Sequence, residues 1–90
     1  MTNDIVYGAP SLPRVIGVVP AENYMLHLTF NNGERRIFDA KPLLGMKVFS
    51  LLNRKGFFDS VRVEYGSIAW PNDIDYCPDT LYIESMPEAS

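Results

Sequence analysis

The alternation of apolar and polar residues at positions 24–30 constrains the fold of this chain more than any other feature. Apolar residues occupy every second position from Tyr24 to Phe30, and Met25, His27 and Thr29 stand between them. A period of two is typical of a strand with one face in the core and the other in solvent. The Asn-Asn-Gly that follows at 31–33 predicts a tight turn, because Asn and Gly readily adopt positive φ. We therefore expect a β-hairpin whose second strand ends near positions 39–40.

The register of this hairpin depends on the length of its turn. A two-residue turn at 32–33 would set Leu28 opposite Ile37, whereas a three-residue turn at 31–33 would set Leu26 opposite Phe38. A shift of one residue exchanges the two faces of the return strand. We favour the three-residue turn, because it buries the larger ring of Phe38 beside the apolar face of the first strand.

A second hairpin is predicted within residues 61–70. Positions 61–65 (Val-Arg-Val-Glu-Tyr) alternate, and the Gly-Ser at 66–67 fits a type II′ turn, which takes Gly at its first central position. That turn would pair Tyr65 with Ile68 and Val63 with Trp70 on one apolar face. The agreement between turn chemistry and apolar pairing favours this register.

Local patterns indicate three further elements. Residues 14–19 are rich in β-branched side chains and end at Pro20, which predicts a strand. Apolar positions between Met46 and Lys55 share one helical face, and Gly56 is a natural stop, so we expect the only α-helix of any length there. Further along, Asp79 is expected to cap a single helical turn.

These elements predict an α+β fold, an antiparallel β-meander of two hairpins with one short α-helix packed on it. We expect a single α+β domain over residues 14–84, because an apolar fraction of 47% supports one core and no linker interrupts it. Residues 1–13, with Gly8, Pro10 and Pro13, are interpreted as an N-terminal tail or arm. Residues 85–90 are interpreted as a C-terminal tail.

Charge and cysteine content narrow the partners and the compartment. The 11 acidic and 8 basic residues give a net charge of −3, whereas nucleic-acid binding normally requires a basic patch, so we expect no direct nucleic acid binding. The lone Cys77 cannot form an internal disulfide, which fits a reducing compartment. No signal peptide is visible, and no apolar stretch reaches the ~20 residues that span a bilayer. We therefore expect a cytoplasmic protein without membrane contact.

The order of motifs along the chain resembles one family. The motifs are Leu-Thr-Phe-Asn-Asn-Gly at 28–33, Phe38-Asp39, Pro-Leu-Leu at 42–44, Val48-Phe49, Phe57-Phe58, Ile-Ala-Trp-Pro-Asn at 68–72, Asp75, Pro78-Asp79 and Leu81-Tyr82. Over residues 14–82 the chain is similar to the family named domain of unknown function 2442. The resemblance implies a small α+β fold and no established activity. Some relatives appear beside small toxin-like proteins, such as those of the domain of unknown function 4160 family, which implies an antitoxin-like or partner-binding role.

Residues 66–82 hold the candidates for specific contacts, because this run contains the only Trp and the only Cys. Trp70 could anchor a partner, but packing in the core is the favoured interpretation for a lone Trp. Tyr76 and Tyr82 are better candidates for exposed contact, and Asp75 and Asp79 complete the set of candidate interaction residues. Pairing at an open sheet edge, including homodimerisation, is a further route to a partner.

We therefore expect a non-catalytic protein–protein interaction module, antitoxin-like towards a neighbouring small toxin-like protein. The alternative is a small-ligand or substrate-binding site at the 66–82 loop, with Asp75 and Asp79 as its polar groups. No enzyme activity and no cofactor are expected. The acids at 73, 75, 79 and 84 have the spacing of a calcium loop, but Cys77 and Pro78 stand where such a loop needs an oxygen ligand and a Gly, so no metal is expected.

Overall fold

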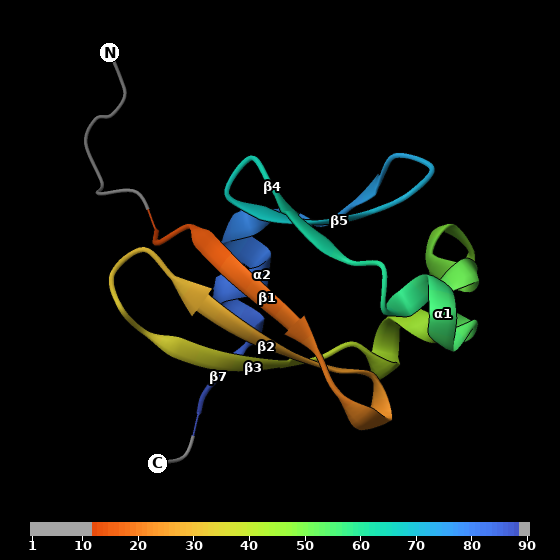
Figure 1. Cartoon of the computed structure of the whole chain (residues 1–90), viewed down its shortest axis with the longest axis horizontal. Coiled ribbons are helices and arrows are strands. Elements are labelled where there is room, and N and C mark those ends of the chain that lie inside the picture. The colour runs from red at the N-terminus through yellow and green to blue at the C-terminus, as the bar shows by residue number, and fades with distance from the viewer. Residues whose placement is uncertain (1–11, 89–90) are drawn as a thin grey trace.

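The structure of the chain, a computed structural model, describes residues 12–88 and contains two antiparallel sheets and several short helices (Figure 1). The first sheet has the strand order β1-β2-β3-β7, with the bounds Val15–Pro20, Met25–Phe30, Arg35–Asp39 and Met86–Pro87. The second sheet has the order β4-β5-β6, with the bounds Arg62–Glu64, Ser67–Trp70 and Ile74–Asp75. The predicted α+β class is confirmed.

The first hairpin has the favoured register. Leu26 pairs with Phe38 across β2 and β3, and both side chains are buried. Gly33 adopts the left-handed conformation in the turn, with φ 90°, which a residue with a side chain rarely does. The three-residue turn is therefore confirmed. On the other side of β2, β1 pairs antiparallel with an irregularity between Val15 and Gly17.

The second hairpin has a register that the sequence analysis did not predict. Val63 pairs with Ile68, and not with the residue two positions further on. The turn residues are Tyr65 and Gly66, both with positive φ (51° and 76°), which is the conformation of a type I′ turn instead of type II′. The Tyr65 side chain is consequently 96% exposed. The Gly66 carbonyl accepts a hydrogen bond from the Val15 N–H (2.9 Å), which joins this hairpin to β1.

Within residues 12–88, five short helices connect and cover the strands. Three are 3-10 helices: η1 (Glu22–Tyr24), η2 (Lys41–Gly45) and η3 (Lys47–Asn53). Two are α-helices: α1 (Lys55–Phe58) and α2 (Pro78–Glu84).

The prediction of an α-helix between Met46 and Lys55 is wrong. η3 covers most of this stretch, and turns of the 3-10 type close it, as between the Phe49 N–H and the Met46 carbonyl (3.0 Å). Met46 and Arg54 flank η3 with extended backbones (ψ 136° and 116°), so the helix continues at neither end. α1 follows and contains Gly56, the expected stop. The longest α-helix described is α2, with seven residues where a single turn was expected.

The boundary expected at residue 84 also needs correction. Ser85 is buried, and Met86 and Pro87 form β7 by pairing with Ile37 and Arg36 of β3. The first part of the expected tail, 85–90, therefore belongs to the folded domain. A strand of two residues has no periodic pattern to indicate it. The predicted arm, 1–13, lies outside the described residues except for positions 12 and 13.

The core lies between one face of the four-stranded sheet, α2, β5 and the η3–α1 segment. Its fully buried large side chains are Trp70, Phe30, Phe58, Leu26, Leu28, Leu52, Ile68 and Leu81. Figure 1 shows α2 behind the four-stranded sheet and the β4–β5 hairpin above it. No other described element lies in front of the sheet in this view, so its second face is open among residues 12–88.

Candidate functional site

The five predicted contact residues do not form one surface. Trp70 lies in β5, Asp75 in β6, and Tyr76 in the link to α2, whereas Asp79 and Tyr82 lie on α2. Trp70 is buried, both tyrosines are half-buried, and only the two aspartates are exposed. The surroundings of each side chain therefore decide what it can do.

Trp70 is a core residue, as the sequence analysis favoured. Its side chain is 0% exposed, and its indole N–H donates a hydrogen bond to the Phe58 carbonyl (3.0 Å). The Phe49 and Phe58 rings lie 6.4 and 6.3 Å from the indole, between centroids. A buried Trp needs an acceptor for its N–H, and the fold provides one. Trp70 therefore stabilises the core and is not available to anchor a partner.

Tyr76 is less exposed than predicted. Its ring lies between the rings of Phe38 and Phe49, at centroid distances of 5.4 and 5.9 Å. The Tyr76 hydroxyl donates a hydrogen bond to Glu84 Oε1 (2.6 Å). Burial, and then the neighbouring carboxylate of Glu84, raise the pKa of Tyr76 to about 12. One edge of this tyrosine still reaches the surface, where it lines the groove described below.

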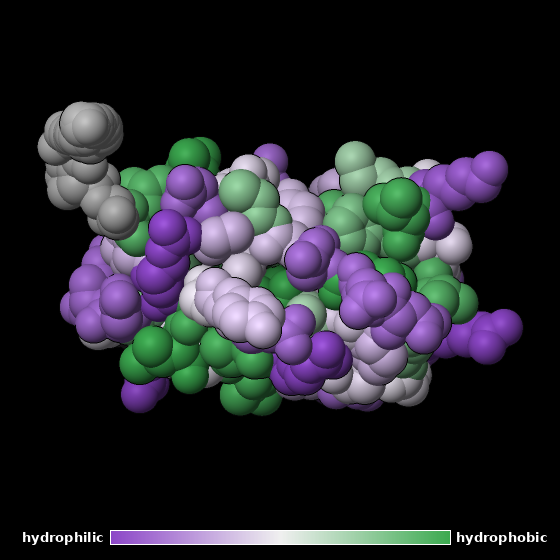
Figure 2. Space-filling model, turned by 90° about the horizontal axis from the view of Figure 1, so that it is seen from above, coloured by the Kyte–Doolittle hydropathy of each residue, from purple (hydrophilic) through white to green (hydrophobic). Residues whose placement is uncertain are grey.

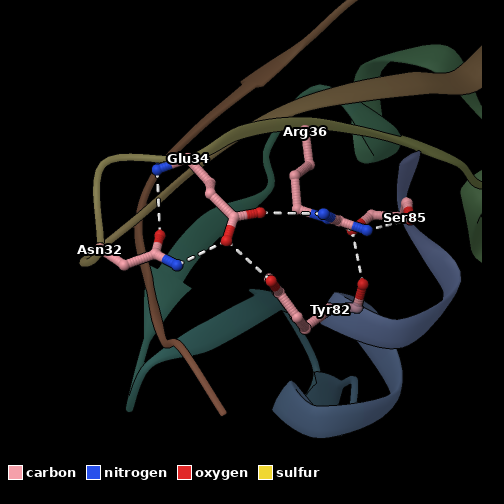
Figure 3. Close-up of polar contacts among 5 residues, drawn as sticks. All are labelled: Asn32, Glu34, Arg36, Tyr82 and Ser85. Atoms are coloured by element: carbon pink, nitrogen blue, oxygen red, sulfur yellow. Dashed lines mark hydrogen bonds and ion pairs between the residues drawn. The ribbon is translucent and has the colours of Figure 1, made fainter. Parts of the chain in front are cut away.

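Tyr82 belongs to a polar cluster that joins α2 to β3 (Figure 3). The Arg36 guanidinium lies over the Tyr82 ring, with Cζ 4.4 Å from the ring centroid. Arg36 also donates hydrogen bonds to the Ser85 hydroxyl and to the Ser85 carbonyl, each at 2.7 Å. The Phe30 ring packs edge-on against Tyr82, at a centroid distance of 5.0 Å. Tyr82 is therefore held between the sheet and α2, where it is half-buried and less exposed than expected.

Glu34 completes this cluster, which we call the β3–α2 clamp and define as Asn32, Glu34, Arg36, Tyr82 and Ser85. One Glu34 oxygen accepts from Arg36 Nη1 (2.9 Å), and the other accepts from the Tyr82 hydroxyl (2.8 Å). The side-chain amide of Asn32 donates to Glu34 at 2.6 Å. These donors, the Tyr82 hydroxyl first, hold the pKa of Glu34 below its usual value, and the same hydrogen bond raises the pKa of Tyr82. Because the Glu34 carboxylate and the Arg36 guanidinium pair with each other, we interpret the clamp as a structural element that joins β3 to α2.

Asp79 does not cap α2 as expected. The N-cap of α2 is Cys77, followed by Pro78 at the first helical position, where the missing N–H costs nothing. Asp79 lies in the first turn and pairs with Arg14 (Nη1 to Oδ1, 3.3 Å), although both side chains are largely in solvent. The Thr80 N–H is the main cause that holds the pKa of the exposed Cys77 thiol below its usual value.

Asp75 and Tyr76 border a surface groove that the sequence analysis missed, here called the η3 groove. One hollow has a volume of about 390 Å³ and is lined by Val48, Phe49, Asp73, Ile74 and Asp75. A second hollow, of about 330 Å³, is lined by residues that include Phe38, Leu43, Met46, Tyr76 and Glu84. The Phe49 and Tyr76 rings, one from each hollow, are 5.9 Å apart, so the two hollows adjoin.

The rim of the η3 groove combines apolar and acidic side chains. Val48 is 70% exposed and Met46 is 52% exposed, which is unusual for apolar residues of this size. Asp73 and Asp75 are exposed beside Val48, and neither forms an ion pair within residues 12–88. Glu84 stands beside Met46 in the second hollow. The groove therefore offers apolar contact area framed by negative charge.

Other candidate chemistry is not assembled by the fold. His27 lies in β2 on the open face of the sheet, where its Nδ1 is 3.0 Å from Glu88 Oε2. Cys77, a thiol that a nearby His could in principle activate, lies at the start of α2, which packs on the opposite face of the sheet from His27. Within the described residues, no three His, Cys, Asp or Glu side chains are grouped to hold a metal ion. None of the helices among residues 12–88 has the length and apolar character to cross a membrane.

A comparison with protein families identifies the family of this chain. The model of one family, described as Protein of unknown function (DUF2442), matches residues 15–86, from the first residue of β1 into β7. The chain belongs to the DUF2442 family. The family resemblance seen in the motifs is therefore confirmed. No curated protein and no solved structure matches the chain. In this DUF2442 protein the matched residues include the whole β3–α2 clamp and both hollows of the η3 groove.

The sequence carried a partial signal for the groove. The apolar pattern between Met46 and Lys55 predicts an amphipathic α-helix, on which Val48 would face the core. In η3 the backbone is of the 3-10 type, and Val48 instead points to solvent while Phe49 is buried. The exposure of Val48 is therefore a consequence of helix type, which the apolar pattern alone did not determine.

Proposed function

We propose that this DUF2442 protein is a non-catalytic protein–protein interaction module and that its partner is the small toxin-like product of a neighbouring gene. The observation that supports this proposal most strongly is the η3 groove, where the exposed Val48 and Met46 (70% and 52%) lie beside acidic side chains. Exposed apolar side chains that are grouped and framed by polar residues are typical of interaction sites.

The rim of the groove indicates the chemistry of the partner. Asp73 and Asp75 stand on one side of Val48, and Glu84 stands beside Met46. The chain as a whole carries a net charge of −3. Complementary charge increases the association rate and selects the partner. The proposed partner therefore presents one or two apolar side chains flanked by Lys or Arg, which is the character expected of a small basic toxin-like protein.

The remaining predicted properties belong to the same proposal. An acidic chain whose basic residues occur singly or in pairs is proposed to bind no nucleic acid directly, and to act without enzyme activity in the cytoplasm. Its antitoxin-like action would consist of covering the partner's basic surface.

The alternative function, a small-ligand site at the 66–82 loop, has weaker support. That proposal needed Trp70 and Tyr76 to line one cavity with Asp75 and Asp79 as its polar groups. Trp70 is fully buried, and Asp79 is engaged with Arg14 on the side of the molecule next to β1. We therefore propose the protein partner and not the small ligand.

Co-expression with the neighbouring reading frame tests the proposed function. The wild-type chain should co-elute with that product in size exclusion with light scattering, at the summed mass of the two chains or a multiple of it. Asp75→Lys should weaken this complex, because it reverses a charge at the groove, whereas Glu22→Lys, an exposed acid on η1, should not. Elution of the wild-type chain without the product would contradict the proposal for that partner.

A further inference from the structure

The open face of the four-stranded sheet carries an ordered row of side chains. The strand registers place Val19, His27, Ile37 and Met86 opposite one another in one row across β1, β2, β3 and β7. Val19 is 62% exposed and Met86 is 69% exposed, at the two ends of the row. The lower left of Figure 2, which is the side of the sheet that faces the viewer in Figure 1, shows hydrophobic residues at the surface.

Charged residues of this face lie on either side of the row, and one of them, Glu88, reaches the row, where it lies 3.0 Å from His27 Nδ1. Residues 35, 37 and 39 of β3 point to the same face, because side chains alternate along a strand. Arg35 and Asp39 therefore flank Ile37, one towards each end of β3. Arg35 forms no ion pair among residues 12–88, while Asp39 pairs only with Lys41 (3.1 Å), at 47% side-chain exposure.

We propose that this face binds a second copy of the same chain. The two copies stack with these faces together, related by a two-fold axis that lies between the sheets and parallel to the row. The strands of one copy then run opposite to those of the other. β3 of one copy then lies over β3 of the other, so that Arg35 of each copy meets Asp39 of the other. Each such contact occurs twice, which is the property of an isologous interface. The apolar residues of the row meet in the middle, and the opposite charges meet at the rim.

The surface relief of the face agrees with this arrangement. A hollow of about 390 Å³ near Gly17, Thr29 and Arg35 lies on one side of the row. A second hollow, of about 290 Å³, lies on the other side, near Met25 and Asp39. The proposed two-fold axis places the end of the sheet that carries one hollow over the end that carries the other. Arg35, which lines the first hollow, then faces Asp39, which lines the second.

The size of the face sets the strength of the dimer. Four strands about 4.8 Å apart, three of them with five or six residues and β7 with two, at about 3.3 Å per residue, span at most roughly 19 by 20 Å. This is a small area compared with the roughly 800 Å² per partner of a standard interface. The dimer should therefore be weak, with a Kd of about 10 to 100 µM, and should form as the concentration rises. This inference rests on the open face of the sheet and not on the η3 groove, although Asp39 and Glu84 line both the second hollow of the groove and one hollow of the sheet face.

Sedimentation velocity over about 1 to 300 µM tests the dimer, since that range brackets the expected Kd. The mass of the wild-type chain should rise from 10.2 kDa towards twice this value. Arg35→Asp and Asp39→Arg should each remain monomeric, because each variant sets two like charges against each other. An equimolar mixture of the two variants should form a heterodimer, because both rim contacts are then between opposite charges. A wild-type chain that stays monomeric throughout, or single variants that dimerise like the wild type, would overturn the proposal.

A second pair of variants controls for folding, because Asp39→Arg also removes the hydrogen bond from the Lys41 N–H (2.9 Å). Val19→Asp should abolish the dimer without unfolding the chain, since this side chain already lies largely in solvent. Val48→Asp, a similar change in the η3 groove, should dimerise like the wild type. If Val19→Asp instead abolishes co-elution with the neighbouring product, the sheet face belongs to that partner and the homodimer is wrong.

Discussion

The guanidinium carbon of Arg36 lies 4.4 Å from the centroid of the Tyr82 ring, and this contact fastens α2 to the four-stranded sheet. Arg36 points to the core side of β3, where its side chain is 13% exposed. A cation in this position is tolerated only when its donors are satisfied, and Glu34 and Ser85 satisfy them. The β3–α2 clamp thus holds α2 against the sheet through polar contacts, in addition to the apolar contacts of the core.

Removal of Arg36 should destabilise the fold strongly. Arg36→Ala removes the side-chain donor of the Ser85 carbonyl and the donor to one oxygen of Glu34, and it uncovers the Tyr82 ring. We expect a loss of about 2–4 kcal/mol in the free energy of unfolding, measured by urea denaturation. Arg62→Ala is the matched control, because Arg62 is an exposed strand residue whose pair with Glu64 should contribute less than about 1 kcal/mol. Equal effects of the two variants would show that the clamp is not structural.

The clamp also predicts a loss of stability in acid. The pKa of Glu34 in the folded chain is lower than the usual 4.5, so the unfolded chain binds the proton more readily. The stabilisation is complete above pH 4.5 and is lost as the pH falls through the folded pKa. Glu34→Gln should therefore flatten the acid side of the stability profile, followed by thermal denaturation at a series of pH values. Glu22→Gln should leave the profile unchanged. A Glu34→Gln profile as steep as that of the wild type would contradict this assignment.

The raised pKa of Tyr76 predicts a loss of stability at alkaline pH. Its pKa is raised from 10.0 to about 12, so the folded chain holds this proton more tightly than the unfolded chain. The stabilisation is complete below pH 10 and is lost as the pH rises towards 12. An ultraviolet absorbance titration should show that the latest of the tyrosine transitions is missing in Tyr76→Phe, while Tyr82, whose pKa is also raised, keeps its own transition. Tyr65→Phe, which removes the hydroxyl of a 96% exposed side chain, should leave the late transition in place. If the latest transition is unchanged in Tyr76→Phe, it belongs to another tyrosine and the assignment is wrong.

A substitution in the strained turn between β4 and β5 should stabilise the fold. Tyr65 has a φ of 51° and makes little packing contact, and Asn adopts this conformation at lower cost. Tyr65→Asn should raise the free energy of unfolding by about 0.5–1 kcal/mol. Gly66→Ala should lower it, because φ is 76° and a Cβ there would lie 3.1 Å from Arg14 Cβ. No gain from Tyr65→Asn would mean that the Tyr65 conformation is not strained.

Parts of this fold followed from local pattern, and parts did not. The first hairpin was predictable, because seven alternating residues and Gly33 specify both the strand and its turn. The second was misread by one turn position, because a Tyr with positive φ is not expected from residue type. α2 was underestimated for a similar reason: apart from its start at Pro78, a seven-residue helix offers too short a pattern for periodicity.

The candidate site was harder to predict than the fold. Tyr82 meets Arg36 only because α2 packs on β3, and nothing near either residue in the sequence indicates that contact. The burial of Trp70 was foreseen, since a lone Trp usually serves the core. The η3 groove required the 3-10 backbone to turn Val48 outward, and the dimer face required the register of four strands. Both surfaces are tertiary properties, which neither composition nor spacing specifies.

Calorimetric titration of the purified neighbouring product measures whether the η3 groove binds the partner. The wild-type chain and Val19→Asp should bind the product with similar affinity. Val48→Asp should bind at least about tenfold more weakly, which corresponds to about 1.4 kcal/mol. Binding of Val48→Asp with wild-type affinity would contradict the assignment of the groove, and absence of binding by the wild-type chain would contradict the proposed function for that product.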